Sequence, residues 1–133
     1  MTYLVDTSAW LDYLQGRETA ASLAVTEILD TGVPFGISSM IYQELLQGAA
    51  SEKDFEALAD YFGTQRFYQL QDPKASHREA AYLYFRCRRE GVTVRSTIDC
   101  LIARLAIENE LELLHNDRDF SNIGRVVPEL HLV

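Results

Sequence analysis

The order of predicted strands and helices is the feature that most constrains the fold of this chain. Short apolar runs rich in β-prone residues alternate with stretches whose apolar residues recur at helical spacing, with Gly, Pro, Ser or Asp at most boundaries. The pattern predicts strands at residues 3–5, 34–37, 67–70 and 111–115, and an edge strand from 126–127 and 130–133 that Pro128 interrupts. It predicts helices at residues 9–14, 18–29, 40–47, 51–62, 75–89 and 98–108. This alternation indicates an α/β fold with a mainly parallel central sheet flanked by helices.

Length and composition indicate one globular domain spanning residues 1–133. Hydrophobic residues make up 47% and charged residues 24%, and no apolar run approaches the roughly 20 residues that cross a membrane. The N-terminus has no basic segment typical of a signal peptide. Cys87 and Cys100 lie in predicted helices, so we expect reduced thiols and a cytoplasmic location.

The formal net charge of −8 argues against a simple nucleic-acid binder, which usually carries a basic surface. An acidic protein can still process RNA if metal ions offset the carboxylates of its site and a local group of arginines holds the backbone. The same charge suits a partner with basic residues. Net charge therefore leaves both an enzyme and a binding protein open.

Four acids follow predicted strands or begin predicted helices. Asp6 comes directly after the first strand, and Asp117 follows the strand at 111–115. Glu44 lies in the first turns of the helix after the second strand, and Asp99 lies in the first turn of its helix. Because ligands of parallel sheets bind beyond the carboxyl ends of the strands, we expect all four acids near one edge of the sheet.

The position of Asp99 on its helix adds a second argument. Asp99 lies beside an apolar stripe formed by Ile98, Leu101, Ile102 and Leu105, so we expect it at the boundary of the buried face. A carboxylate flanked by apolar side chains is costly unless a cation compensates it. Each acid alone also has a local explanation, as a helix cap, a turn residue or a solvated side chain. Spacing alone therefore leaves a metal site and a set of surface acids both open.

Four sequence segments, taken together and in order, resemble the PIN-domain proteins and specifically the VapC-type toxins of VapBC toxin–antitoxin pairs. Any one segment is weak evidence, whereas all four in the order of the family are specific. The segments are Leu4-Val5-Asp6-Thr7-Ser8-Ala9-Trp10-Leu11-Asp12-Tyr13-Leu14, Tyr42-Gln43-Glu44-Leu45-Leu46-Gln47-Gly48, Thr97-Ile98-Asp99-Cys100-Leu101-Ile102-Ala103 and Leu113-Leu114-His115-Asn116-Asp117-Arg118-Asp119-Phe120.

The resemblance implies an endoribonuclease whose acidic quartet binds Mg²⁺ or Mn²⁺. The quartet would be Asp6, Glu44, Asp99 and Asp117, with Asp6 and Asp99 as the most direct ligands; the accessory residues would be Thr7, Ser8, Thr97 and Asp119. Four carboxylates without a converging His or Cys set suit Mg²⁺ or Mn²⁺ better than zinc. Hydrolysis by a metal-activated water would leave a 5′-phosphate and a 3′-hydroxyl.

Arginines near these motifs could supply the positive charge that RNA requires. We expect Arg89, Arg95 and Arg118 to contact phosphates, whereas Arg86 and Arg88 fit a solvated helix face at least equally well. As partners, the resemblance implies the RNA substrate, a second copy of the chain in a homodimer, and a VapB-like antitoxin that inhibits the toxin. We expect no membrane partner, because the apolar runs of the chain are short.

Two other functions are open to an α/β domain with these acids. A phosphoryl-transfer enzyme with an aspartyl nucleophile would need a second acid two residues after Asp6, where Ser8 stands, or a late lysine, whereas the only lysines are Lys53 and Lys74. A non-catalytic PIN-like module that binds RNA or protein is the second alternative. The intact quartet argues against it.

Overall fold

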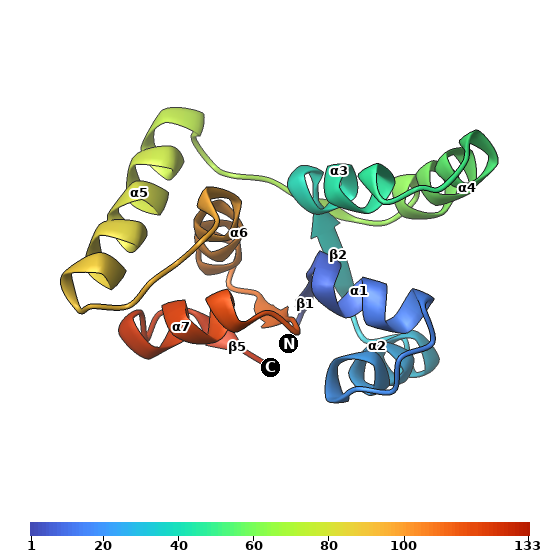
Figure 1. Ribbon diagram of the computed structural model, residues 1–133, viewed down its shortest axis with the longest axis horizontal. Helices are drawn as coiled ribbons and strands as arrows, with labels where there is room; N and C mark the ends of the chain where they lie inside the picture. Colours follow the sequence, from blue (N-terminus) through green and yellow to red (C-terminus); the bar gives the residue numbers. More distant parts are fainter.

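The computed structural model describes residues 1–133 and consists of a five-stranded sheet between two groups of helices (Figure 1). The sheet has the order β3-β2-β1-β4-β5, and every neighbouring pair of strands is parallel, as the sequence predicts. The strands are β1 (Tyr3–Val5), β2 (Phe35–Ser38), β3 (Phe67–Tyr68), β4 (Glu112–Leu114) and β5 (His131–Leu132).

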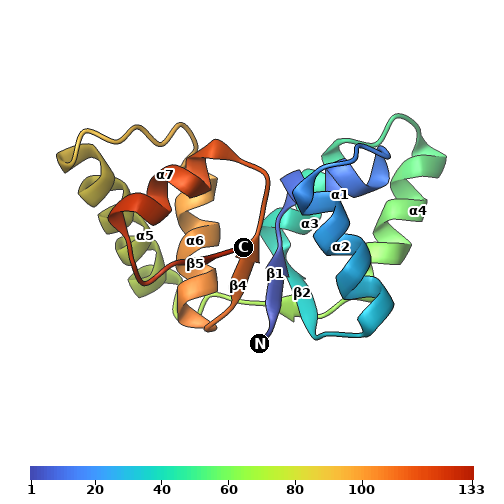
Figure 2. The same ribbon diagram turned by 90° about the horizontal axis from the view of Figure 1, so that it is seen from below.

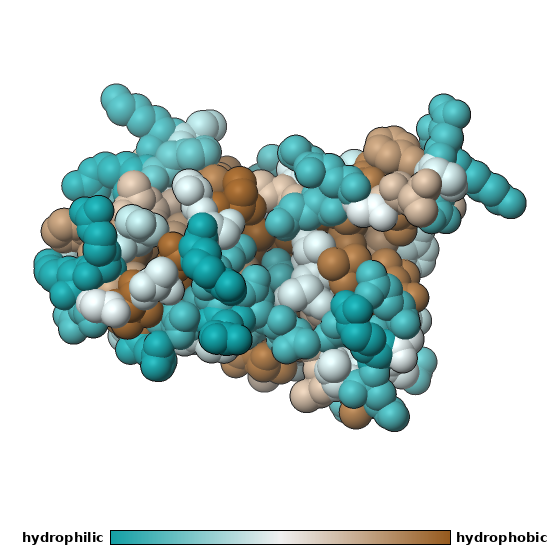
Figure 3. Space-filling model, in the orientation of Figure 1, coloured by the Kyte–Doolittle hydropathy of each residue, from teal (hydrophilic) through white to brown (hydrophobic).

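Helices cover both sides of the sheet. Figures 1 and 2 show α1 to α4 grouped on one side and α5 to α7 on the other. Hydrophilic and apolar side chains are interspersed over the face in Figure 3. None of the helices combines the length and the hydrophobicity of a membrane-spanning segment. The helices are α1 (Thr7–Leu14), α2 (Ala20–Thr31), α3 (Ser39–Gln47), α4 (Glu52–Gly63), α5 (Pro73–Arg89), α6 (Thr97–Glu108) and α7 (Arg118–Val126).

Three neighbouring strands are each followed directly by the polar cap of a helix. Asp6 after β1 caps α1, Ser38 at the end of β2 caps α3, and Asp117 just beyond β4 caps α7. In each case a side-chain oxygen accepts a hydrogen bond from a backbone N–H in the first turn of the helix. The carboxyl edge of the sheet therefore gathers polar side chains together with the N-terminal ends of helices.

The sequence prediction is wrong for the segment after β4. Residues Arg118–Val126 form helix α7 instead of a polar turn followed by a strand, and the edge strand β5 is confined to His131–Leu132. The helix contains Ser, Asn and Gly, which are poor helix formers, and it buries only Phe120 and Ile123 among its apolar residues. Packing against the rest of the protein, rather than local propensity, therefore stabilises α7.

The buried face of α6 is also rotated from the predicted one. Ile98 is 38% exposed, whereas Ala103 and Ala106 are completely buried. Asp99 is only 7% exposed and lies on the same face as these alanines, rather than at its boundary. The small side chains of the alanines allow close packing of this face. Of the predicted apolar stripe, Ile102 and Leu105 are buried as expected, whereas Ile98 is exposed.

Gly36 allows β3 to approach β2 closely. A Cβ atom at Gly36 would lie 2.5 Å from the carbonyl oxygen of Arg66 and 2.6 Å from the ring of Tyr68. We expect Gly36→Ala to lower the free energy of unfolding by about 2 kcal/mol in urea denaturation, because the backbone of Arg66 must move. Gly48→Ala is the control, since its Cβ would meet nothing nearer than 3.4 Å. Equal stability of the two variants would contradict this role of Gly36.

Candidate metal centre

Three aspartates lie close together near the carboxyl end of β4. One carboxylate oxygen from each of Asp99, Asp117 and Asp119 lies within 4.8 Å of the other two. Asp99 comes from the first turn of α6, and Asp117 and Asp119 come from the cap and first turn of α7. Like charges this close repel one another, and a bound cation removes the repulsion. Hard oxygen donors at this spacing fit a divalent ion such as Mg²⁺.

Asp6 lies at the end of β1 with 4% of its surface exposed. Its Oδ2 accepts two hydrogen bonds from Ser8, at 3.0 Å from the backbone N–H and 2.6 Å from Oγ. Burial raises the pKa of Asp6 to about 6; the bonds from Ser8 oppose this rise, and the charges of Glu44 and Asp117 add to it. Asp6 is therefore held in one orientation and is in electrostatic contact with the acids of α3 and α7.

Asp99 has the most strongly perturbed carboxylate of the site. Burial, followed by the negative charges of four neighbouring acids, raises its pKa to about 8. In decreasing order of effect, these neighbours are Asp117, Asp6, Asp119 and Glu44. All four members of the predicted quartet, together with Asp119, therefore belong to one cluster of interacting charges. A raised pKa among clustered acids in a polar site is typical of metal-binding and catalytic centres.

Glu44 lies on α3 at the exposed rim of this cluster. The hydroxyl of Thr7 donates a hydrogen bond to its Oε1 at 3.0 Å. This bond connects the start of α1 with α3 and fixes the carboxylate of a long, flexible side chain. Glu44 is therefore open to solvent but oriented, unlike the buried Asp6 and Asp99.

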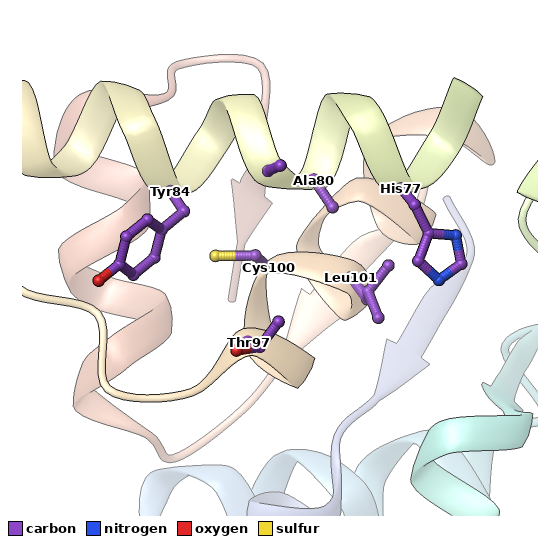
Figure 4. A pocket seen from close by; sticks show the side chains of 7 residues that line it. His77, Ala80, Tyr84, Thr97, Cys100 and Leu101 are labelled. Carbon is purple, nitrogen blue, oxygen red and sulfur yellow. The ribbon is translucent and has the colours of Figure 1, made fainter. Parts of the chain in front are cut away.

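The predicted accessory hydroxyls differ in where they lie. Ser8 connects two parts of the site, because its Oγ donates to Asp6 and accepts the backbone N–H of Asn116 at 2.8 Å. Thr97 is exposed, makes no side-chain hydrogen bond to any acid and lines an apolar hollow of about 250 Å³ between α5 and α6 (Figure 4). Thr7 and Ser8 thus contact acids of the site, whereas Thr97 does not.

The three predicted phosphate-binding arginines fall in two places. Arg95 donates from Nε to Asp119 at 3.2 Å, and its Nη2 lies 3.9 Å from Asp117. Together with Arg118 it lines an open hollow of about 670 Å³ beside the acids. Arg89 lies instead at the C-terminal end of α5, in a separate hollow. Two arginines therefore flank the acidic cluster, and the third does not.

A buried network around Asp12 was not expected from the sequence. The Oδ2 of Asp12 accepts hydrogen bonds from Asn116 Nδ2 at 2.6 Å and Thr19 Oγ1 at 2.9 Å, and its Oδ1 accepts from Arg17 Nε at 2.9 Å. Although burial acts to raise the pKa of Asp12, these hydrogen bonds lower it below its usual value. The network ties α1 to the residue before Asp117, so it positions one of the clustered carboxylates.

Removing the Asp12 carboxylate is expected to loosen this loop. We expect Asp12→Ala to lower the free energy of unfolding by about 2 kcal/mol in urea denaturation, because Asn116 and Thr19 lose a buried acceptor. We also expect Mn²⁺ affinity, measured by calorimetry, to fall on the order of tenfold, as is typical when the support of a metal ligand is lost. Asp30→Ala is the matched control, since Asp30 is exposed on α2. If both variants unfold and bind Mn²⁺ alike, Asp12 has no positioning role.

Comparison with known proteins identifies the family of this chain. Residues 3–126 match the family model of the PIN domain. The VapC ribonuclease Mb1587 of Mycobacterium bovis and the ribonuclease VapC11 of Mycobacterium tuberculosis are each 34% identical to it over 124 residues, which are 92% of this chain and 92% of the relative. The chain belongs to the VapC family of PIN-domain proteins.

Solved structures agree with this assignment at the level of the fold. The VapC-family chain covers 98% of a chain in the crystal structure of VapBC2 from Rickettsia felis bound to a promoter DNA fragment, with a TM-score of 0.72 and 20% identity. It covers 97% of a chain in VapBC-1 from nontypeable Haemophilus influenzae, with a TM-score of 0.74 and 20% identity. In both comparisons all of this VapC-family chain is covered, so the PIN fold extends over its full length.

Proposed function

We propose that this chain is a Mg²⁺- or Mn²⁺-dependent endoribonuclease that acts as the toxin of a cytoplasmic type II toxin–antitoxin system. One observation carries the proposal: acids that follow β1 and lie on α3, α6 and α7 gather at one edge of the sheet. One carboxylate oxygen from each of three of them lies within 4.8 Å of the other two. The ribonucleases named VapC, to which the chain is 34% identical, support RNA as the substrate.

The residues that would hold the metal are Asp99, Asp117 and Asp119, with Asp6 completing the inner set. Asp119, first considered an accessory acid, is thus proposed as a ligand. Glu44, at the rim, would contribute through water or hold a second ion. Oxygen ligands alone, without a converging His or Cys, suit Mg²⁺ and Mn²⁺. When bound, such an ion supplies an activated water and stabilises the charge on the scissile phosphate.

The protein's own side chains would orient the substrate and move a proton. Glu44 is exposed and held by Thr7, so it could accept a proton from the attacking water. Arg95 and Arg118 line the hollow next to Asp117, where their N–H groups could donate to phosphates on either side of the scissile bond. Attack by water would leave a 5′-phosphate and a 3′-hydroxyl.

An inhibitory VapB-like antitoxin and a homodimer complete the proposal. The structures similar in fold are described as VapBC assemblies, which supports a protein partner of the VapB type. The net charge of −8 and the solvent-facing carboxylate of Glu44 suit a partner segment that carries basic residues. The dimer rests on the family resemblance.

A cleavage assay tests the proposed activity. The purified chain is incubated with structured RNA and Mg²⁺ or Mn²⁺, with and without EDTA, beside Asp6→Ala and the control Asp30→Ala. We expect cutting by the wild type and the control only when metal is present, and none by Asp6→Ala. A folded, metal-saturated wild type that binds RNA without cutting any of it would instead support a non-catalytic PIN-like module. Growth arrest on induction, absent for Asp6→Ala, tests the role as a toxin.

A further inference from the structure

The outward face of α7 is polar and free of acidic residues. Arg118, Ser121, Asn122 and Arg125 lie at positions i, i+3, i+4 and i+7 and therefore share one face of the helix. Both arginines are exposed, and the opposite face buries Phe120 and other side chains. The two arginines make this face positively charged in a chain whose formal net charge is −8.

This face ends at a group of three arginines, here called the arginine pocket. Arg125 of α7 and Arg86 and Arg89 of α5 line a hollow of about 520 Å³, together with Glu90. Arg86 is fixed by Glu129, with Nη1 and Oε2 2.9 Å apart. Arg125 Nη2 donates to Asn122 at 2.7 Å, and the guanidinium of Arg89 lies 5.4 Å from the ring centre of Phe85.

Two exposed aromatic rings lie on the same face of α5 as Arg86 and Arg89. Tyr82 and Phe85 are both 43% exposed, and their rings are stacked with centroids 6.0 Å apart. The spacing 82, 85, 86, 89 is again i, i+3, i+4, i+7, so this face combines two aromatic and two cationic side chains. Aromatic platforms beside positive charge are the combination that binds single-stranded nucleic acids.

The polar face of α7 connects this pocket to the acidic cluster. The helix begins directly after Asp117, and the amide of Asn122 donates to the carbonyl of Thr93 at 3.4 Å, which ties the middle of α7 to the loop that carries Arg95. The rise of a helix places Arg118 and Arg125 about 10 Å apart along its axis. That span is about three stacked nucleotides. In Figure 3 the surface over α7 shows hydrophilic side chains around a small apolar patch.

We propose that the outward face of α7 and the arginine pocket bind a single-stranded segment of the RNA substrate, about three nucleotides from the scissile phosphate. The arginines would contact the phosphates, and the ring of Phe85 or Tyr82 would stack on a base. The inference rests on the proposed ribonuclease function and adds a second region of substrate contact to it. It makes Arg89 and Arg125 determinants of substrate binding, whereas Arg86 is paired with Glu129 at the wall of the pocket.

Equilibrium binding tests this inference without requiring catalysis. A fluorescent single-stranded RNA of about 12 nucleotides is titrated with the protein in EDTA at several salt concentrations. For the double variant Arg89→Gln/Arg125→Gln we expect Kd to rise about tenfold, because two phosphate contacts are lost. The slope of log Kd against the logarithm of the salt concentration should fall by roughly 1.4 for the same reason. The matched control is Arg78→Gln, an exposed arginine in the N-terminal half of α5, which should stay within about twofold of wild type. Thermal unfolding shows that all variants are folded.

Cleavage kinetics separate this inference from the proposed function. With metal and a long RNA, the double variant should raise KM about tenfold and leave kcat unchanged, because it removes binding far from the reacting atoms. With a substrate too short to reach the pocket, the double variant should behave as wild type.

If the wild type cuts RNA but the double variant binds and cuts like Arg78→Gln, the pocket does not bind the substrate and the ribonuclease function stands. If the wild type never cuts, the function fails, and binding in EDTA still decides the inference. Unchanged RNA binding combined with lost binding of an acidic peptide would overturn it in favour of a protein partner.

Discussion

Replacing Asp99 with asparagine is expected to lower kcat for RNA cleavage at least about a thousandfold, with the fold intact. The variant keeps the shape of the side chain but removes the carboxylate that would bind the metal together with those of Asp117 and Asp119. Weaker metal binding and a misplaced ion would cost about 4 kcal/mol of transition-state stabilisation, which corresponds to about three powers of ten in rate. Single-turnover cleavage with saturating Mg²⁺ or Mn²⁺ measures the effect.

Two controls accompany the Asp99→Asn experiment. Asp30→Asn makes the same chemical change at an exposed position on α2 and should cut RNA at the wild-type rate. Urea denaturation of metal-free Asp99→Asn should show a stability equal to or above that of wild type at pH 8 and above, because the variant cannot bury an uncompensated charge. If folded Asp99→Asn cuts RNA within tenfold of wild type, Asp99 is not a metal ligand in the reaction.

The metal-free protein is expected to lose stability as the pH rises from about 5 to 9. The pKa values of Asp6 and Asp99 are raised from 3.8 to about 6 and about 8 in the folded state. At a pH between the pKa of a group in the unfolded chain and its higher pKa in the folded protein, the folded protein binds more protons than the unfolded chain. The free energy of unfolding is therefore greatest at the acidic end of this pH range and falls as the pH rises towards the folded-state pKa. A loss of about 5 kcal/mol, or about 18 °C in Tm, is expected between pH 5 and 8.

Divalent metal should reverse this loss. Protons and metal compete for the same carboxylates, so saturating Mg²⁺ or Mn²⁺ should raise Tm more at pH 8 than at pH 6. Thermal unfolding from pH 5 to 9, with metal and with EDTA, measures both effects, and Asp99→Asn should flatten the EDTA profile above pH 6. A Tm in EDTA that increases from pH 6 to 8, or a profile that Asp99→Asn leaves unchanged, would contradict the clustering of these charges.

Local sequence signals were sufficient to predict where most of the clustered acids lie. Asp6 and Asp117 follow strands and cap the next helices, and both roles depend on residues a few positions apart. The parallel sheet then brings such positions to one edge, which is why Glu44 and Asp99 could also be expected there. The alternation of strands and helices likewise predicted the sheet and six of the seven helices, with boundaries shifted by one or two residues at most ends.

What the sequence could not provide depends on contacts between distant segments. Asn116 and Asp12 are 104 residues apart in the chain, and nothing in the spacing of either residue indicates their hydrogen bond. Asp119 was expected in a turn, but it is buried in the first turn of α7. Local propensity does not reveal this helix, because few of its apolar residues are buried. Thr97 is a different case, because it lies two residues before Asp99 on α6 and residues at this spacing do not share a helix face. Its side chain lines the hollow between α5 and α6 (Figure 4).

The chemical ends of the RNA products test most directly whether these carboxylates form a metal-dependent hydrolytic site. Purified wild-type protein is incubated with an end-labelled RNA in Mg²⁺, in Mn²⁺ and in EDTA, and the new 5′ and 3′ ends are identified enzymatically, with Asp99→Asn as the control for contaminating nuclease. Water-mediated hydrolysis predicts a 5′-phosphate and a 3′-hydroxyl, formed only with metal and only by the wild type. Products with a 2′,3′-cyclic phosphate, or equal cutting by the wild type in EDTA, would contradict this account.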